Sequence, residues 1–408
     1  MTSEHPESHA TASTRSPTVS WFELFYDLVV VAAISLTNDA FLAHPSLENA
    51  GLAVVCMAAL AWIWFLTTLY NNMFPGGDLL RRLLLLLQMA AIAIAGLSVD
   101  QVHGIDNRVG LLAYGCALAI VAGLIVWGGI TARSRIRTRS LVPILAATAI
   151  CLAGAIDSTS RSGAYLAAAM LASVLPLLLT TYAQWSDASM IRLDHLRERL
   201  GLFVLIVLGE GFAQLLSALH FLGTIPRSEV FALVFILSFA VWWIYFDGTF
   251  SDHTVLATVR WRLTLLGHLT LVFGITGTLD ILVLLAAGEE NELGDASLTY
   301  FVGCLSLVLL SFALLTFTAK GRLGIHGWVQ LACGVLIVVV GLVLVPQSDT
   351  STDAVVGLSG AIVVANAIIA VWADATSDRR PWRASLGLAL RGEADPPPVE
   401  GSPSRPPV

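Results

Sequence analysis

The sequence predicts an all-α protein, a polytopic transmembrane helix bundle of about twelve spans. Only 12% of its 408 residues are charged, whereas a soluble domain carries about 25%. Hydrophobic residues make up 56% of the chain and the mean hydropathy is +0.79, so too few polar side chains remain to cover a soluble surface. Apolar runs of about 20 residues, enough to cross a bilayer core of about 30 Å, recur along nearly the whole length. These observations exclude a soluble monomer and predict a lipid bilayer as the surroundings.

Polar breaks divide the apolar sequence into twelve runs, each of which predicts one helix. The first run follows a polar leader, residues 1–20, and is long enough to stay in the membrane, so we expect no cleaved secretory signal. A Pro-rich segment follows the last run and predicts a disordered tail over 376–408. In chain order the predicted spans are 21–43, 50–72, 79–99, 108–130, 140–157, 162–183, 199–221, 228–250, 262–286, 297–319, 325–346 and 353–374. Together they define a transmembrane domain over 21–375.

The arginines and lysines test this division independently, because basic residues favour cytoplasmic loops. With twelve spans, nineteen of the 22 basic residues fall on one side of the membrane, and three, Arg108, Arg161 and Arg227, fall on the other. A missed or invented span in the middle of the chain would destroy this asymmetry. We therefore expect a multi-pass protein of the cell (cytoplasmic) membrane with both termini in the cytoplasm.

Several residues recur at one spacing and indicate an internal repeat. Six helices in each copy would give the halves 21–185 and 195–375 the same orientation, a parallel 6+6 repeat of the kind found in some secondary transporters. Leucine-rich helices also align readily with one another, so chance alignment is the alternative. The pairs related by a shift of 180 residues are Arg82 and Arg262, Gln88 and His268, Asp100 and Asp280, and Trp62 and Trp242.

Acidic and imidazole side chains within or beside the predicted spans form the candidate proton, cation or substrate site. Ionisable groups are costly in hydrocarbon and therefore indicate function, and the ones selected here are carboxylates and imidazoles, with no Lys or Arg among them. Carboxylates removed from water without a cationic partner take up a proton or hold a cation. Asn72, Gln88 and Asp280 are secondary candidates. The primary candidates are Glu23, Asp27, His195, Glu198, Glu210, Asp247 and His268.

Most of these residues also have a structural interpretation. Glu23 and Asp27 lie near a helix N-terminus, where acids interact favourably with the helix dipole. Asp247 could pair with a neighbouring arginine, and Glu198 could belong to a solvated interfacial face. Glu210 is the hardest to explain in structural terms, because it lies about three turns inside its span.

Motifs for a cofactor or a catalytic nucleophile do not occur in the sequence. The five cysteines stand singly in apolar runs and predict core side chains rather than disulfides or a zinc site. There is no nucleotide-binding Gly-rich loop, no Ser-His-Asp order and no H-E-x-x-H. We expect no cofactor, with a metal ion at the carboxylate and imidazole cluster as the alternative. Nucleic acid is not expected as a partner, and the sequence indicates no oligomeric state.

The string over 23–29, Glu-Leu-Phe-Tyr-Asp-Leu-Val, resembles the opening signature of the bacterial low temperature requirement A (LtrA) family. The resemblance covers roughly residues 20 to 375 and implies an integral membrane protein linked to growth in the cold, with no particular substrate. Further strings follow in the family's order: His-Leu-Arg-Glu-Arg over 195–199, Leu-Gly-Glu over 208–210, Trp-Trp-Ile-Tyr-Phe-Asp over 242–247 and Gly-His-Leu over 267–269.

Three functions are compatible with these features. The first is a proton- or cation-linked transporter or ion-conducting protein, which the twelve spans and the intramembrane acids favour. The second is a membrane-embedded enzyme acting on a lipid or isoprenoid, with the same side chains as acid/base groups or metal ligands. The third is a non-catalytic scaffold or sensor linked to growth in the cold. We expect the first, a protein that binds a small ion or small molecule and is not an enzyme.

Overall fold

The structure is a computed structural model of the chain. The predictions for residues 1–20 and 376–408 lie almost wholly outside the residues that the structure describes. The described residues are 19–43, 45–76, 78–100, 108–131, 138–157, 161–179, 192–249, 261–288, 293–346 and 351–376.

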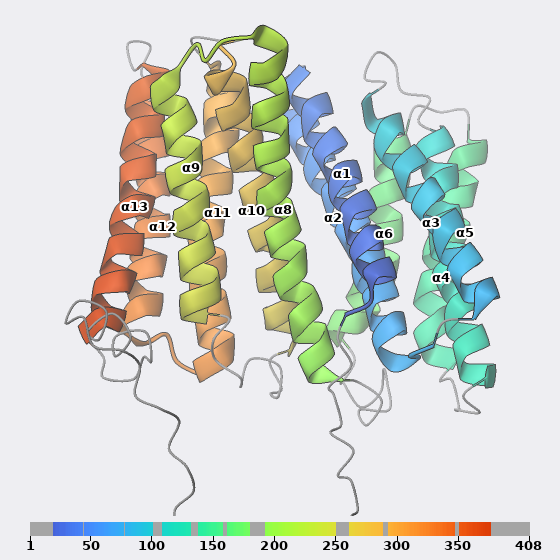
Figure 1. Cartoon of the computed structure of the whole chain (residues 1–408). Helices are drawn as coiled ribbons and strands as arrows, with labels where there is room; N and C mark the ends of the chain where they lie inside the picture. The colour runs from blue at the N-terminus through green and yellow to red at the C-terminus, as the bar shows by residue number, and fades with distance from the viewer. Residues whose placement is uncertain are drawn as a thin grey trace, which may run out of the picture.

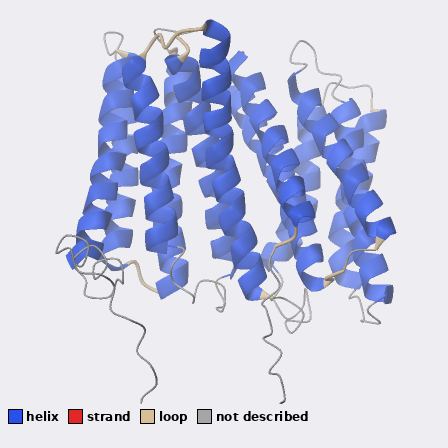
Figure 2. Ribbon diagram, in the orientation of Figure 1, coloured by secondary structure: helices blue, strands red, loops and turns tan. Residues whose placement is uncertain are grey.

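Twelve α-helices make up nearly all of the described chain, which contains no strand (Figure 2). Ten of them are long and apolar enough to cross a membrane, and the apolar parts of α5 and α6 are shorter. The prediction of an all-helical membrane bundle is confirmed. The helices are α1 Trp21–Ala43, α2 Leu47–Met73, α3 Leu79–Leu97, α4 Arg108–Thr131, α5 Thr138–Ile156, α6 Ser162–Leu179, α8 Leu193–Leu222, α9 Ser228–Trp243, α10 Trp261–Ala286, α11 Asp295–Lys320, α12 Gly324–Leu344 and α13 Thr352–Thr376.

Local capping explains several of the helix boundaries. The Ser46 side chain accepts a hydrogen bond from the Asn49 backbone N–H and caps the start of α2. The Asp78 side chain accepts one from the Arg81 backbone N–H and caps the start of α3. At the other end of a helix, Gly223 adopts a left-handed conformation with φ of 66° and terminates α8. These boundaries agree with the predicted spans to within a few residues.

Helix α8 begins earlier than the sequence predicts, and this difference matters for the site. Its first residue is Leu193, whereas the predicted span begins at 199. The charged stretch over 194–199 is helical rather than a loop, because its polar residues divide between two faces: His195 and Arg199 are buried, whereas Asp194 and Glu198 are exposed. The Arg199 side chain is thus buried inside the bundle, although the sequence analysis did not include it among the site residues.

The helices form two groups that lie side by side, α1 to α6 and α8 to α13 (Figure 1). Contacts between the groups involve α1 and α2 on one side and α8 and α10 on the other. Helix α9 continues beyond Trp243 as a π-helical segment, Ile244–Thr249, a rare geometry that is frequent at functional sites. The main interface of the molecule therefore lies between α1 and α2 of the first group and α8 and α10 of the second.

Helix neighbours recur in the same order in both groups. In the first group α1 packs on α3, α3 on α4, α4 on α5, and α5 on α6; in the second, α8 packs on α10, α10 on α11, α11 on α12, and α12 on α13. This pattern is the one that a duplication of six helices leaves, and the duplication itself stays a prediction.

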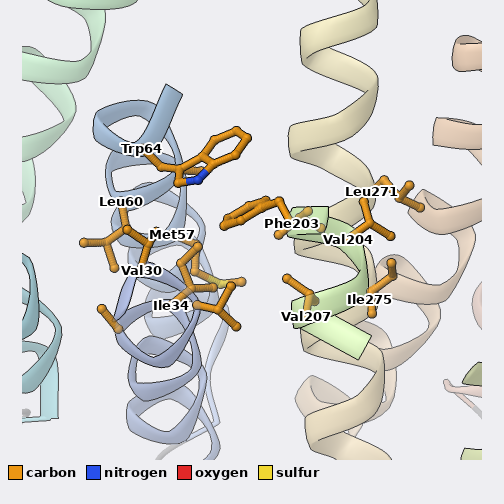
Figure 3. Packing of buried hydrophobic residues seen from close by; sticks show 14 of the residues in the cluster. Val30, Ile34, Met57, Leu60, Trp64, Phe203, Val204, Val207, Leu271 and Ile275 are labelled. Atoms are coloured by element: carbon orange, nitrogen blue, oxygen red, sulfur yellow. The ribbon is translucent and has the colours of Figure 1, made fainter. Parts of the chain in front are cut away.

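An apolar layer fills the interface between the two groups (Figure 3). The Trp64 ring stacks on Phe203, with centroids 4.0 Å apart. The side chains of the layer are all nearly inaccessible to solvent, so this part of the interface excludes water. The layer consists of Val30, Ile34, Met57, Leu60, Trp64, Phe203, Val204, Val207, Leu271 and Ile275.

Candidate functional site

Four ionisable side chains from α1 and α8 meet between the two helix groups and form what we call the Asp27–Arg199 network. Arg199 Nη2 lies 2.5 Å from Asp27 Oδ1, and Arg199 Nη1 lies 3.2 Å from Glu23 Oε1. His195 Nε2 lies 3.4 Å from the other oxygen of Glu23. The side chains of Asp27 and Arg199 are both 0% exposed. Two carboxylates, a guanidinium and an imidazole thus share one buried site.

Helical spacing brings these four groups together. Glu23 and Asp27 are four residues apart on α1, and His195 and Arg199 are four residues apart on α8, so each pair lies on one helix face. Close to its N-terminus, α1 is held by Ser20, whose backbone N–H and hydroxyl both donate to Glu23 Oε2 over 2.9 Å. The carboxylate of Glu23 therefore caps α1 and also pairs with α8.

Side chains of α2 complete the network. Trp64 Nε1 donates to Asp27 Oδ1 over 2.6 Å, and Arg199 Nη2 donates to the Thr68 hydroxyl over 3.2 Å. The Arg199 guanidinium also lies 6.0 Å from the centroid of the Trp64 ring. Asp27 Oδ2 is buried and has no hydrogen-bond partner among the described residues. One carboxylate oxygen can therefore take up a proton without breaking a contact that the structure describes.

The charge balance of the network depends on one proton. With a neutral imidazole, two carboxylates outnumber the single guanidinium; protonation of His195 or of a carboxylate balances the charges. Buried charges are stable only when paired and hydrogen-bonded. The network therefore balances its charges when it holds one proton.

Asn72 joins α2 to the beginning of α8. Its amide nitrogen donates to the Arg192 carbonyl over 2.8 Å, and its amide oxygen accepts from the Arg192 backbone N–H over 2.8 Å. The same nitrogen lies 3.3 Å from His195 Nδ1. Asn72, a secondary candidate, thus fixes the position of the imidazole that contacts Glu23.

A second polar cluster lies farther along α1, and we call it the Asn38–Asp280 triad. Asn38 Nδ2 donates to Asp280 Oδ2 over 2.5 Å, and the Tyr300 hydroxyl donates to Asn38 Oδ1 over 2.5 Å. Asp280 is 4% exposed and interacts electrostatically with Glu210 of α8 and with Asp39. The triad joins α1 to α10 and α11 and contains a buried carboxyl.

The two clusters lie at different depths. Along α1, Asp27 and Asn38 are eleven residues apart, about 16 Å in a helix, and Arg199 and Glu210 are separated equally on α8. The apolar layer of Figure 3 lies between them, since Val30 and Ile34 stand between Asp27 and Asn38. Glu210 therefore lies away from the Asp27–Arg199 network and within electrostatic range of Asp280.

The remaining candidates lie outside both clusters. His268 is hydrogen-bonded through both nitrogens, Nδ1 2.7 Å from the Thr264 carbonyl and Nε2 3.0 Å from the Tyr245 hydroxyl. Glu198 is exposed on α8. Asp247 lies in the π-helical segment, and its side chain is outside the described part of the structure.

Gln88, the repeat partner predicted for His268, also bonds to a hydroxyl of the preceding helix. Its carbonyl accepts from Thr67 over 3.2 Å, and its amide donates to the Ala117 carbonyl over 3.1 Å. Gln88 and His268 thus have similar structural positions in the two groups, and both are anchored.

Metal coordination has little geometric support in the described ranges. No group of three or more His, Cys, Asp or Glu side chains there is arranged to hold a metal ion. At the Asp27–Arg199 network, the guanidinium already pairs with one oxygen of each carboxylate, Asp27 Oδ1 and Glu23 Oε1. A metal at this cluster stays a prediction.

Sequence reasoning missed the residue at the centre of the network, Arg199. Two signals could have found it: Arg199 follows His195 at a spacing of four on a helix, and the paired acids of α1 require a cation. Asn38 and Tyr300 were also missed, because neutral polar residues are common in membrane helices and carry little signal by themselves.

Comparison with known proteins identifies one family. A family model described as bacterial low temperature requirement A protein (LtrA) matches residues 18–375, which include the Asp27–Arg199 network and the Asn38–Asp280 triad. No curated protein matches the chain.

Proposed function

This chain belongs to the bacterial low temperature requirement A (LtrA) family of membrane proteins, and we propose that it moves protons across the membrane, alone or coupled to a small solute. The observation that carries this proposal is the buried Asp27–Arg199 network. It pairs α1 of one helix group with α8 of the other and is placed where a change in protonation alters the contact between the groups.

The network has the chemistry of a proton site. Removing the negative charge of Asp27 or Glu23 weakens the attraction for Arg199, because an ion pair in a low-dielectric interior depends on both charges. The loss of this attraction favours separation of α1 from α8. Protonation is thereby coupled to a change in the packing of the two helix groups, which is the requirement for proton-linked transport.

The Asn38–Asp280 triad supplies a second proton site. A buried carboxyl with one amide donor is more stable with a proton or a cation than as a bare anion. The apolar layer between the two sites acts as a barrier in this state, because no hydrogen-bonding group of the layer faces the interface except the Trp64 indole that binds Asp27. A proton would pass from one site to the other when the helix groups move and water enters the layer.

Proton flux into proteoliposomes tests the proposal. Purified full-length protein is reconstituted with a pH-sensitive dye inside the vesicles, and a pH step is applied at zero and at negative membrane potential. We expect dye acidification with the wild-type protein and its loss in Asp27→Asn, which keeps the hydrogen-bond acceptor for Trp64 but removes the charge.

Glu198→Gln is the matched control, because it removes an exposed acid that directly precedes Arg199 on α8. Its flux should equal that of the wild-type protein. If wild-type vesicles show no flux with protons, or with a panel of cations and small solutes, transport is overturned, and the enzyme and scaffold alternatives gain support.

A further inference from the structure

The amide of Asn72 contacts the imidazole of the Asp27–Arg199 network, and its orientation is fixed by the backbone of Arg192. The Arg192 carbonyl, which can only accept a hydrogen bond, lies 2.8 Å from one terminal atom of the amide. The Arg192 backbone N–H, which can only donate, lies 2.8 Å from the other. The first atom is therefore the amide nitrogen and the second the amide oxygen, because a rotated amide would lose both hydrogen bonds.

This orientation determines which nitrogen of His195 carries a proton. Asn72 Nδ2 lies 3.3 Å from His195 Nδ1. The nitrogen has two hydrogens, one for the Arg192 carbonyl and one for His195, and it accepts no hydrogen bond. His195 Nδ1 must therefore be the acceptor, without a hydrogen of its own. The neutral imidazole thus has its proton on Nε2, which faces Glu23 Oε2 at 3.4 Å.

A second proton on His195 is opposed by the same contact. It would bind to Nδ1 and place an N–H against the N–H of Asn72, so that two donors faced each other. His195 is only 5% exposed and Asn72 is 0% exposed, so bulk water cannot take the place of the missing acceptor. A buried donor without an acceptor is costly. Rotation of the amide would relieve the conflict only by breaking both hydrogen bonds to Arg192.

The charged groups around the imidazole act in both directions. Glu23 attracts a positive imidazole, but the neutral form already directs its Nε2–H to this carboxylate. Arg199, which contacts the other oxygen of Glu23, repels a positive imidazole, and so does Arg192, whose Nε donates to the Asn72 carbonyl over 3.3 Å. The other charged residues in this part of α8 are exposed or half-buried: Asp194, Arg197 and Glu198. The Asn72 contact therefore decides against the imidazolium.

Glu23 has no oxygen free to take up a proton. Its Oε1 pairs with Arg199 Nη1 over 3.2 Å. Its Oε2 accepts from the Ser20 backbone N–H and hydroxyl, each over 2.9 Å, and also faces His195 Nε2. Because donors surround both oxygens, a proton on either one would displace a contact that the structure describes.

Asp27, in contrast, has one free oxygen. Its Oδ1 accepts from Trp64 Nε1 and pairs with Arg199, whereas its Oδ2 is buried without a hydrogen-bond partner among the described residues. Tyr26, the titratable neighbour of Asp27 on α1, directs its hydroxyl hydrogen to Thr67 over 3.1 Å. A proton on Oδ2 therefore displaces none of these hydrogen bonds.

We propose that Asn72 is a positioning residue that keeps His195 neutral, with its proton on Nε2, so that the proton taken up by the network binds to Asp27 Oδ2. The inference rests on the proposed function for the role of that proton, and it names the atom that carries it. A proton from water bonds to Oδ2 and neutralises the carboxylate. The network then holds one carboxylate, one guanidinium and a neutral imidazole, so its charges balance.

Nitrogen NMR and infrared difference spectroscopy of the full chain in lipid bilayers test the assignment without measuring transport. The protein carries isotope-labelled histidine, and the His195 signals are those lost in His195→Gln. We expect a protonated Nε2 and an unprotonated Nδ1 in the wild-type protein. On acidification, a carboxylic acid band that is absent in Asp27→Asn should appear before any imidazolium signal of His195.

Two asparagine variants test the positioning role. Asn72→Asp replaces the donor that faces His195 Nδ1 by an acceptor, so His195 should now take up its second proton before Asp27 takes up one. Asn71→Asp is the matched control, because it adds the same charge at the preceding residue, whose side chain contacts Arg81 Nη2 over 2.8 Å instead. It should keep the wild-type tautomer and the wild-type order of protonation.

If Asn72→Asp does not fold, as judged by thermal unfolding, the wild-type tautomer and order of protonation decide. A proton on His195 Nδ1, an imidazolium signal that precedes the Asp27 band, or equal effects of Asn71→Asp and Asn72→Asp would overturn the proposal. Both expected signatures in a wild-type protein without proton flux would support this assignment and overturn the proposed transport. Proton flux with the opposite tautomer would do the reverse.

Discussion

Arg199 is the residue on which the interface between the helix groups depends. Its guanidinium is fully buried and contacts both carboxylates of α1. Arginine suits this position because its planar fork can contact two acceptors at once and it stays charged when buried. A lysine at the same place would supply a single ammonium group and would engage Asp27 and Glu23 less well.

Substitutions at this pair should show strong energetic coupling. Arg199→Gln or Asp27→Asn alone leaves a buried charge poorly compensated, and we expect each to lower the free energy of unfolding by about 3 kcal/mol. The double variant should cost clearly less than the sum of the two, because both charges are then absent. Thermal unfolding in detergent measures all three. Additive losses would show that Asp27 and Arg199 are not a pair.

At the scale of elements, glycines set the distance between α10 and α11. A Cβ atom added at Gly277 would lie 2.5 Å from Cys304 Sγ and 3.0 Å from the Tyr300 hydroxyl. Tyr300 is the residue that donates to Asn38 in the triad. Close packing of these two helices and the geometry of the second polar cluster therefore depend on the same position.

Gly277→Ala should destabilise the protein by about 1–3 kcal/mol, since overpacking moves side chains and backbone. Gly303→Ala, on the facing helix α11, meets no atom within 4 Å and should have little effect or a slightly favourable one. Thermal unfolding of the two variants in the same detergent makes the comparison. Equal stability of the two would contradict the close approach of α10 and α11.

If the apolar layer is the barrier to protons, a polar substitution within it should cause a proton leak. Val204 is 0% exposed and lies within the layer, whereas its neighbour Leu205 is 44% exposed on the outer face of α8. Val204→Ser should raise passive proton leak by roughly tenfold, as expected for a barrier lowered by about 1.4 kcal/mol. Leu205→Ser is the control. A leak that is equal in both variants would mean that the layer is not the barrier.

At the scale of the whole molecule, the length of the hydrophobic runs predicted nearly every helix. A helix that crosses the hydrocarbon core needs about 20 apolar residues, and such a run is easily recognised in a sequence. The exception is the start of α8, where charges conceal a helix. Run length cannot distinguish a charged loop from a helix that buries one polar face, since both contain the same residues. Contact between α1 and α8 is what makes the buried arginine favourable, and this contact is a tertiary feature.

The candidate site was predictable only in part for the same reason. Glu23, Asp27 and His195 were found from their chemistry and do meet in the structure. Glu210 lies eleven residues along α8 from Arg199, and therefore at a different depth from the Asp27–Arg199 network. Its functional role stays a prediction. The placement of both termini in the cytoplasm rests on the arginine count and stays a prediction.

Proton flux through variants of both polar clusters tests the central claim most directly. The claim is that Asp27 and Asp280 serve one path in series across the apolar layer. In the proteoliposome assay, Asp27→Asn, Asp280→Asn and the double variant should lose flux to the same extent, while Glu198→Gln retains it. Flux that persists in either single variant, with both proteins folded and reconstituted equally, would contradict the account.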